Sequence, residues 1–289
     1  MTTSDFNALV ERGVVLLDGA TGSQLRAKGM PVGVSTELWV YEHPEVIVDL
    51  QRAYVDAGSN IIYAPTFSAN RVGLGMHGLE DQLAELNAGL VKLSKQAAGG
   101  RALVAGDFTT TGKPLEPVGT MSYQALLDIY REQIEVVVAA GVDLLGAETM
   151  LTVDECACFV EAARSVCDLP VMCTLTIEAD GHLLFGGNVV EAVETLQALG
   201  VSAVGLNCSV GPDQLEAVVA SMKAVATVPV IAKPNAGMPV MDERGQAHYS
   251  MTPAQFAGSM AKLVQAGASV IGGCCGTGPT YIAALKAMV

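Results

Sequence analysis

Short apolar runs alternate along the whole chain with longer segments in which apolar residues return every three or four positions. The runs are rich in Val, Ile and Ala and are typical of buried strands, whereas the longer period indicates amphipathic helices, as in residues 122–141. We expect eight strands, at Val14–Asp18, Ile61–Ala64, Ala102–Gly106, Asp143–Ala147, Val171–Thr176, Ala203–Asn207, Val230–Lys233 and Ser269–Gly272.

Each expected helix connects one strand to the next, and several end in the glycine that usually caps a helix C-terminus. Connections of this kind make the strands parallel, so the alternation predicts an α/β fold. We favour a (β/α)8 TIM barrel over a doubly wound open sheet, because there are eight units and chemically interesting residues end nearly every strand. No linker or change of composition divides residues 1–289, which we expect to form one domain.

Composition and charge narrow the classes of function. The chain is 51% hydrophobic with 31 glycines and few aromatic residues, which suits many tight strand-to-helix turns. Its net charge of −14 makes binding to nucleic acid or to an anionic membrane surface improbable. The N-terminal MTTSDFNALVERG has no signal-peptide pattern, and no apolar run reaches the roughly 18 residues of a membrane span. We therefore expect a cytoplasmic protein.

Three of the seven cysteines stand where two expected strands end. Cys208 follows the sixth strand in GLNCS, and the adjacent Cys274 and Cys275 follow the last strand between glycines that permit a sharp turn. Three thiolates at one rim would bind Zn²⁺ and leave one coordination position open, as catalytic sites do. The alternative is that all three are small buried residues, because free cysteine is often part of a core.

Four motifs occur in order along the chain: LLDGATGSQL, GLNCS, KPNAGMPV and IGGCCGTGPTYI. With these motifs the sequence resembles the homocysteine S-methyltransferase family, over about residues 12 to 287. It resembles most closely the homocysteine-binding module of cobalamin-dependent methionine synthase.

The resemblance implies a set of metal ligands. Cys208, Cys274 and Cys275 would bind zinc, and Asn235 in KPNAG would supply a fourth ligand before substrate binds. Asn235 can equally be a turn residue that caps the end of the seventh strand.

The resemblance also implies a substrate site. Asp18 would hold the amino-acid end of homocysteine together with the loop that follows it, Gly19, Ala20, Thr21 and Gly22. Glu148, at the end of the fourth strand, is the second candidate partner for the ammonium group, although such an acid is often only a helix N-cap. An aspartate can pair with an ammonium, and the exposed N–H groups of a glycine-rich turn can bind a carboxylate.

These residues predict transfer of a methyl group to a zinc-bound thiolate, which for homocysteine gives methionine. The expected donor is methylcobalamin on a separate corrinoid protein, because the chain has no complete D-x-H-x-x-G corrinoid motif. Asp180 and His182 begin that motif, but Phe185 occupies its glycine position. Betaine or S-methylmethionine stays open as a donor, since relatives that use these donors share the zinc cysteines.

Three other functions stay open. The same chemistry could methylate another thiol, or the chain could be a non-catalytic subunit that binds zinc and a corrinoid protein. Lys233 also ends a strand, where the Schiff-base lysine of an aldolase could lie, but the three rim cysteines would then have no purpose.

Overall fold

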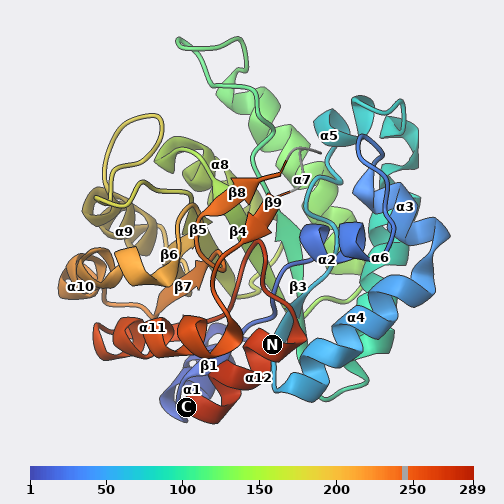
Figure 1. The fold of residues 1–289 in the computed structure, drawn as a ribbon. Coiled ribbons are helices and arrows are strands. Elements are labelled where there is room, and N and C mark those ends of the chain that lie inside the picture. Colours follow the sequence, from blue (N-terminus) through green and yellow to red (C-terminus); the bar gives the residue numbers. More distant parts are fainter. Residues whose placement is uncertain (243–246) are drawn as a thin grey trace.

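The computed structural model of the chain, described for residues 1–242 and 247–289, is an eight-stranded parallel barrel surrounded by helices (Figure 1). The strands follow the order β1-β10-β7-β6-β5-β4-β3-β2. They are β1 (Val15–Leu16), β2 (Ile61–Tyr63), β3 (Leu103–Phe108), β4 (Leu144–Met150), β5 (Val171–Leu175), β6 (Ala203–Cys208), β7 (Val230–Pro234) and β10 (Ala268–Ile271).

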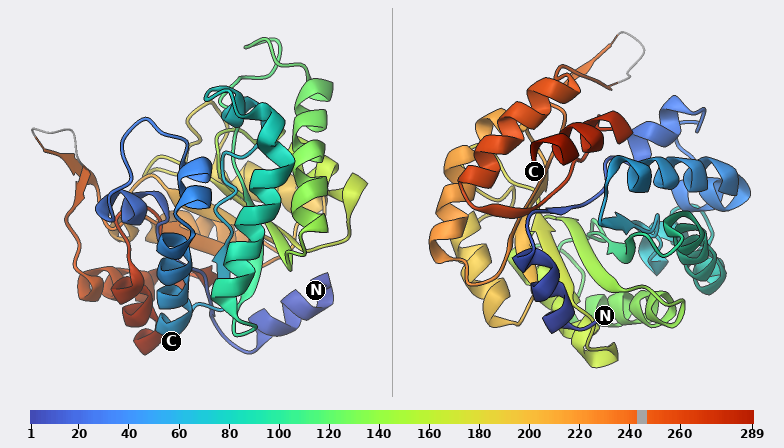
Figure 2. Two further views of the ribbon diagram at one scale, coloured as in Figure 1. Left: turned by 90° about the vertical axis from the view of Figure 1, so that its right-hand side faces the viewer. Right: turned by 90° about the horizontal axis from the view of Figure 1, so that it is seen from below.

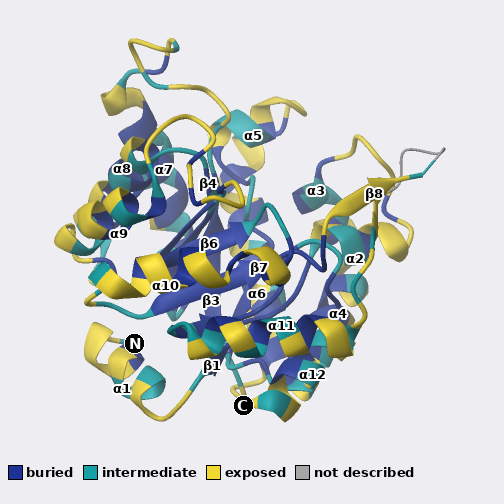
Figure 3. Cartoon of the chain, turned by 60° about the vertical axis from the view of Figure 1, so that its left-hand side comes forward, coloured by how far each residue is buried: buried dark blue, intermediate teal, exposed yellow. Residues whose placement is uncertain are grey.

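The helices lie outside this sheet, so that the strands are the most buried part of the molecule (Figures 2 and 3). They are α1 (Thr3–Glu11), α2 (Gly22–Ala27), α3 (Thr36–Glu42), α4 (Pro44–Ala57), α5 (Arg71–Gly75), α6 (Leu83–Ala98), α7 (Tyr123–Ala139), α8 (Val153–Val166), α9 (Val189–Ala198), α10 (Glu216–Val225), α11 (Pro253–Gln265) and α12 (Pro279–Met288). Two short 3-10 turns, η1 (Glu80–Gln82) and η2 (Pro212–Gln214), precede α6 and α10.

The TIM barrel expected from the sequence is confirmed, and each of the eight expected strands is present. The largest difference is at β4, which continues to Met150 because it pairs with β5 beyond an irregularity after Ala147. The sequence reading did not include the antiparallel hairpin of β8 (Pro239–Met241) and β9 (Ala247–Tyr249). Its strands are short and mostly exposed, so no buried apolar run marks them.

The strands are positioned by two apolar layers that follow from the alternation of side chains along a strand. Val15, Ile61 and Ile231 pack together inside the barrel, whereas Leu16 and Ile62 face outward against the helices. Phe6 of α1 is fully buried in the inner layer. Helix α1 therefore covers the end of the barrel where the strands begin (Figure 2).

The gap between β1 and β2 is closed mainly by hydrogen bonds of the Asp18, Ser59 and Asn60 side chains rather than by a ladder of backbone hydrogen bonds. The backbone N–H of Asn60 donates to the Leu16 carbonyl at 2.7 Å, and its side-chain Oδ1 accepts the Leu16 N–H at 2.8 Å. On the other side, the Asn60 carbonyl accepts the Leu103 N–H. Asn60 thus joins β1 to the β2–β3 edge of the sheet.

None of the helices within residues 1–242 and 247–289 is both long enough and apolar enough to cross a bilayer.

We predict that Asn60→Ala destabilises the barrel, because the Leu16 N–H loses its acceptor inside the sheet. The expected loss in the free energy of unfolding is about 1–3 kcal/mol, measured by urea denaturation. Asn7→Ala, at an exposed position of α1, is the control and should change stability by less than about 0.5 kcal/mol. Equal stability of wild type and Asn60→Ala would contradict this account of closure.

Candidate metal and substrate site

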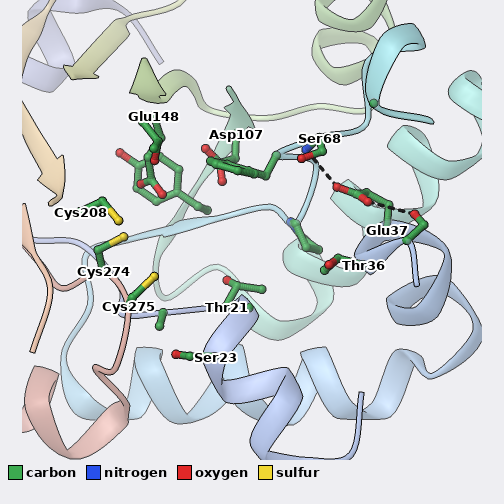
Figure 4. A pocket seen from close by; sticks show the side chains of 18 of the residues that line it. Thr21, Ser23, Thr36, Glu37, Ser68, Asp107, Glu148, Cys208, Cys274 and Cys275 are labelled. Atoms are coloured by element: carbon green, nitrogen blue, oxygen red, sulfur yellow. Dashed lines mark hydrogen bonds between the residues drawn. The ribbon is translucent and has the colours of Figure 1, made fainter. Parts of the chain in front are cut away.

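A cavity of about 410 Å³ lies at the end of the barrel where the strands finish (Figure 4). One side is lined by the loop after β1, including Gly19, Ala20, Thr21 and Gly22. Other strands contribute side chains from around the barrel. These are Tyr63, Asp107, Glu148, Cys208, Lys233, Cys274 and Cys275.

The three cysteines that the sequence predicts as metal ligands lie together at this cavity. The Sγ atoms of Cys208, Cys274 and Cys275 lie within 4.8 Å of one another, with Cys274 buried and the other two half-buried. Thiolates bound to one tetrahedral zinc at about 2.3 Å would be roughly 3.8 Å apart, so this separation fits a shared metal ion. The other cysteines are also free thiols; Cys156, Cys158 and Cys173 are fully buried, as expected for packing residues.

Backbone hydrogen bonds fix the loop that carries Cys274 and Cys275 onto β7. The Cys274 N–H donates to the Pro234 carbonyl at 2.8 Å, and the Ala236 N–H donates to the Cys275 carbonyl at 3.0 Å. Gly276 then turns the chain with φ +83°, and a Cβ atom there would lie 2.3 Å from Cγ of Tyr249. The cysteine pair therefore depends on a glycine that follows it and on the hairpin that covers it.

Three non-glycine residues with left-handed backbone lie at this site: Thr149, Cys208 and Ser209. Such a conformation costs about 1–2 kcal/mol per residue and needs compensating contacts. Asn207 Oδ1 accepts the Thr149 N–H at 2.8 Å, and Ser209 Oγ accepts the Ile177 N–H at 2.9 Å. Strain gathered at one place in the fold points to a functional site.

Asn235, the expected fourth metal ligand, is buried beside Ser209. Its Nδ2 donates to the Ser209 carbonyl at 3.0 Å, while its Oδ1 is buried without a hydrogen-bond partner. An amide oxygen in this condition is available to a further donor or to a cation.

Hydrogen bonds among the three thiols shift the pKa values of Cys275 and Cys208 in opposite directions. The pKa of Cys275 is lowered to about 3, because its sulfur accepts from Cys208 and Cys274 and is also approached by the Tyr249 hydroxyl. The pKa of Cys208 is raised, because its thiol donates to both neighbours and is partly buried. The hydrogen bonds among the three sulfurs thus lower the pKa of Cys275 at the expense of Cys208.

A buried ion-pair group lies under the other side of the cavity. Lys233 Nζ is 2.6 Å from Glu148 Oε2 and 3.4 Å from Asp18 Oδ1, and it lies 4.3 Å from the centre of the Tyr63 ring. Burial lowers the pKa of Lys233, but attraction to Glu148 and Asp18 outweighs it, and the pKa rises well above its usual value. Lys233 is therefore held as an ammonium, which disfavours the Schiff-base role considered for it.

The substrate-binding residues expected from the sequence lie at different depths relative to the cavity. Glu148 and residues 19–22 line the cavity, whereas Asp18 lies beneath it, with its Oδ2 accepting the Tyr63 N–H at 2.8 Å. Burial raises the pKa of Asp18 to about 6, against the attraction of Lys233. The Ala20 N–H donates to Thr277, so it already has a partner within the protein.

Two acidic residues of the cavity were missed by the sequence reading. Glu37 ties two loops together, because its carboxylate accepts from Ser35 Oγ at 3.0 Å and from the Ser68 N–H at 2.9 Å (Figure 4). Asp107 lies on β3 and lines the cavity. Strand periodicity could have found it, since Asp107 is two residues after the inward-facing Ala105.

Comparisons with known proteins identify the family to which the sequence is similar. Residues 15–289 match the sequence model of the family described as homocysteine S-methyltransferase. The chain is 28% identical to the methionine synthase of Mycobacterium tuberculosis over 99% of its own length and 25% of that protein. It therefore spans about a quarter of the length of the methionine synthases that it matches.

Similarity over nearly the whole length is found with a homocysteine methyltransferase of Escherichia coli, in sequence and in structure. The chain is 27% identical to the homocysteine S-methyltransferase of Escherichia coli, over 96% of both proteins. The metallated form of the homocysteine methyltransferase MmuM from Escherichia coli matches with a TM-score of 0.84 and 26% identity, covering 98% of this chain and 99% of that one.

We predict that Gly276→Ala destabilises the protein by about 1–2 kcal/mol or more, since alanine disfavours a positive φ and its Cβ meets the Tyr249 ring. Urea denaturation of the reduced, metal-free protein measures this change. Gly258→Ala is the matched control, because that glycine lies in α11 with open space around its Cβ position. It should be neutral or stabilising by about 0.5–1 kcal/mol, and similar stabilities of the two variants would refute the prediction.

Proposed function

The chain belongs to the homocysteine S-methyltransferase family, and on this basis we propose that it transfers a methyl group to the thiol of homocysteine, giving methionine. The observation that carries the proposal is the convergence of three cysteine sulfurs on a cavity with charged side chains across from them. Such a cavity suits a small molecule with a thiol at one end and an amino-acid group at the other. In this proposal residues 1–289 act as one domain.

The proposed metal is one Zn²⁺ held by Cys208, Cys274 and Cys275, with Asn235 as fourth ligand until substrate binds. The clustered thiols and the unpartnered Oδ1 of Asn235 support this donor set, as does the existence of a metallated form of MmuM. Bound zinc would keep a coordinated thiol ionised at neutral pH. The protein's part is to hold the ligands in position, with Cys208 in a left-handed backbone turn.

The rest of the cavity would bind and orient the amino-acid end of homocysteine. Glu148 would accept from the ammonium group, and the loop of Gly19, Ala20, Thr21 and Gly22 would receive the carboxylate through N–H groups other than that of Ala20, which donates to Thr277. Thr21 caps α2 without a side-chain hydrogen bond, which leaves the first N–H groups of that helix available to a ligand. Asp18 would contribute from below, by fixing Lys233 and Tyr63.

The proposed donor is methylcobalamin carried by a separate corrinoid protein and not bound stably by this chain. Exposed apolar residues on five strand-to-helix connections, at the end of the barrel where the strands finish, support a protein partner, because exposed apolar surface often marks a docking site. They are Val32, Val34, Met76, Val118, Leu184, Phe185, Met238, Val240 and Met241.

We predict one zinc per chain in protein purified without chelator under reducing conditions. Cys208→Ala should lose most of this metal on dialysis, because two sulfurs and an amide oxygen are a much weaker donor set. Cys167→Ser, which changes a cysteine outside the cluster, should keep it. Metal analysis measures the three proteins, and absence of metal from the wild type, or full occupancy in Cys208→Ala, would contradict the assignment.

We predict that zinc-loaded wild-type protein transfers a methyl group from free methylcobalamin to homocysteine and that Cys208→Ala does not. Product methionine is quantified by mass spectrometry. Turnover with betaine or S-methylmethionine in place of methylcobalamin would reassign the donor. Equal turnover of a simple alkyl thiol would reassign the acceptor, and zinc binding without transfer from any donor would indicate a non-catalytic subunit.

A further inference from the structure

Asp107 carries a carboxyl group whose Oδ1 atom is buried and has no hydrogen-bond partner among the residues that the structure describes. Its backbone is fixed, because the Thr66 hydroxyl accepts the Asp107 N–H at 3.0 Å and donates to its carbonyl at 2.8 Å. The side chain projects into the cavity beside Glu148 (Figure 4), and its Oδ1 is buried and unpartnered. The residue is only 7% exposed, so bulk water does not solvate this carboxylate freely.

The charges in this part of the barrel do not balance. Asp18, Asp107 and Glu148 supply three buried carboxyl groups, and Lys233 is the one buried cation among them. Lys233 Nζ lies against Glu148 at 2.6 Å and Asp18 at 3.4 Å. Asp18 is further occupied by the Tyr63 N–H. Asp107 is therefore the acid left without a counter-charge in contact with it.

Removing a carboxylate from water without a hydrogen bond or an opposite charge is costly, and proteins avoid it outside functional sites. Burial and the nearby Glu148 raise the pKa of Asp107 well above its ordinary value, which reflects the same missing cation. A ligand that brings a cation into the cavity would remove this cost.

We infer that Asp107 binds the α-ammonium group of the thiol substrate, and that it sets the preference for an amino-acid thiol over other thiols. This inference rests on the proposed function and adds a binding residue to it. The three thiols lie across the cavity from Asp107 and Glu148 (Figure 4). A substrate with its sulfur at the cysteines would therefore direct its amino group toward these two acids.

The unpartnered oxygen also distinguishes between kinds of cation. A primary ammonium has three N–H donors and can satisfy Asp107 and Glu148 together. The quaternary ammonium of a small methyl donor such as betaine has no N–H donor and would leave Oδ1 of Asp107 without a hydrogen bond. The geometry at Asp107 therefore favours the ammonium of the methyl acceptor.

The test compares two thiols on two proteins by isothermal titration calorimetry. Homocysteine and 4-mercaptobutanoate, which is the same thiol without the amino group, are titrated into zinc-loaded wild type and Asp107→Asn. Wild type should bind homocysteine more tightly than 4-mercaptobutanoate. Asp107→Asn should bind homocysteine about 10- to 100-fold more weakly than wild type does, which is the effect of losing one charged hydrogen bond. The affinity of Asp107→Asn for 4-mercaptobutanoate should equal that of wild type, which also shows that the variant is folded.

Asp180→Asn, in an exposed loop after β5, is the matched control and should behave as wild type with both thiols. Equal loss of affinity for both thiols in Asp107→Asn, or no loss for either, would overturn the inference while leaving the proposed function standing. A loss confined to betaine in a parallel titration would also overturn it, by assigning Asp107 to the donor. If zinc-loaded wild type bound neither thiol, the proposed function would fail, and the inference with it.

Discussion

Lys233 joins three strands at the end of the barrel where the cysteines lie, and much of the site depends on its charge. Its ammonium contacts Glu148 of β4 and Asp18 after β1, and it lies over the ring of Tyr63 on β2. A buried lysine without such partners would be strongly destabilising, because breaking a buried ion pair leaves a charge uncompensated. The ion pairs therefore fix side chains from distant parts of the sequence in one layer, in which Tyr63, Glu148 and Lys233 line the cavity and Asp18 lies beneath it.

The metal loop is fixed by a different kind of constraint, which lies in the backbone. The cysteine pair is attached to β7 through Pro234 and Ala236. Thr149 and Ser209, which are left-handed like Cys208, are held by hydrogen bonds to the Asn207 and Asn235 side chains. Side-chain hydrogen bonds thus compensate for unfavourable backbone angles at the point where three sulfurs converge. The three cysteines and the acidic side chains line the same cavity. A thiol amino acid needs both, because it carries a thiol at one end and an ammonium group at the other.

The sequence predicted the barrel well because buried parallel strands give clear Val- and Ile-rich runs, and because the glycines before the strands act as helix caps. Gly58, Gly141, Gly200 and Gly267 all have positive φ. The cysteines were found because adjacent cysteines between glycines are distinctive. The hairpin of β8 and β9 could not be found in this way, since its residues are exposed and its contact with Gly276 forms only in the folded chain. Asp107 was missed although period-two alternation places it inside, and the pairing of Lys233 depends on strands far apart in the sequence.

We propose that the three cysteines and one exchangeable oxygen ligand hold a zinc ion to which a thiol substrate binds directly. X-ray absorption at the zinc edge, recorded for the zinc-loaded protein before and after homocysteine is added, tests it most directly. We expect the zinc to have three sulfur neighbours and one nitrogen or oxygen neighbour without substrate, and four sulfur neighbours with substrate bound. A zinc environment that homocysteine leaves unchanged, or one with fewer than three sulfur neighbours at the start, would contradict it.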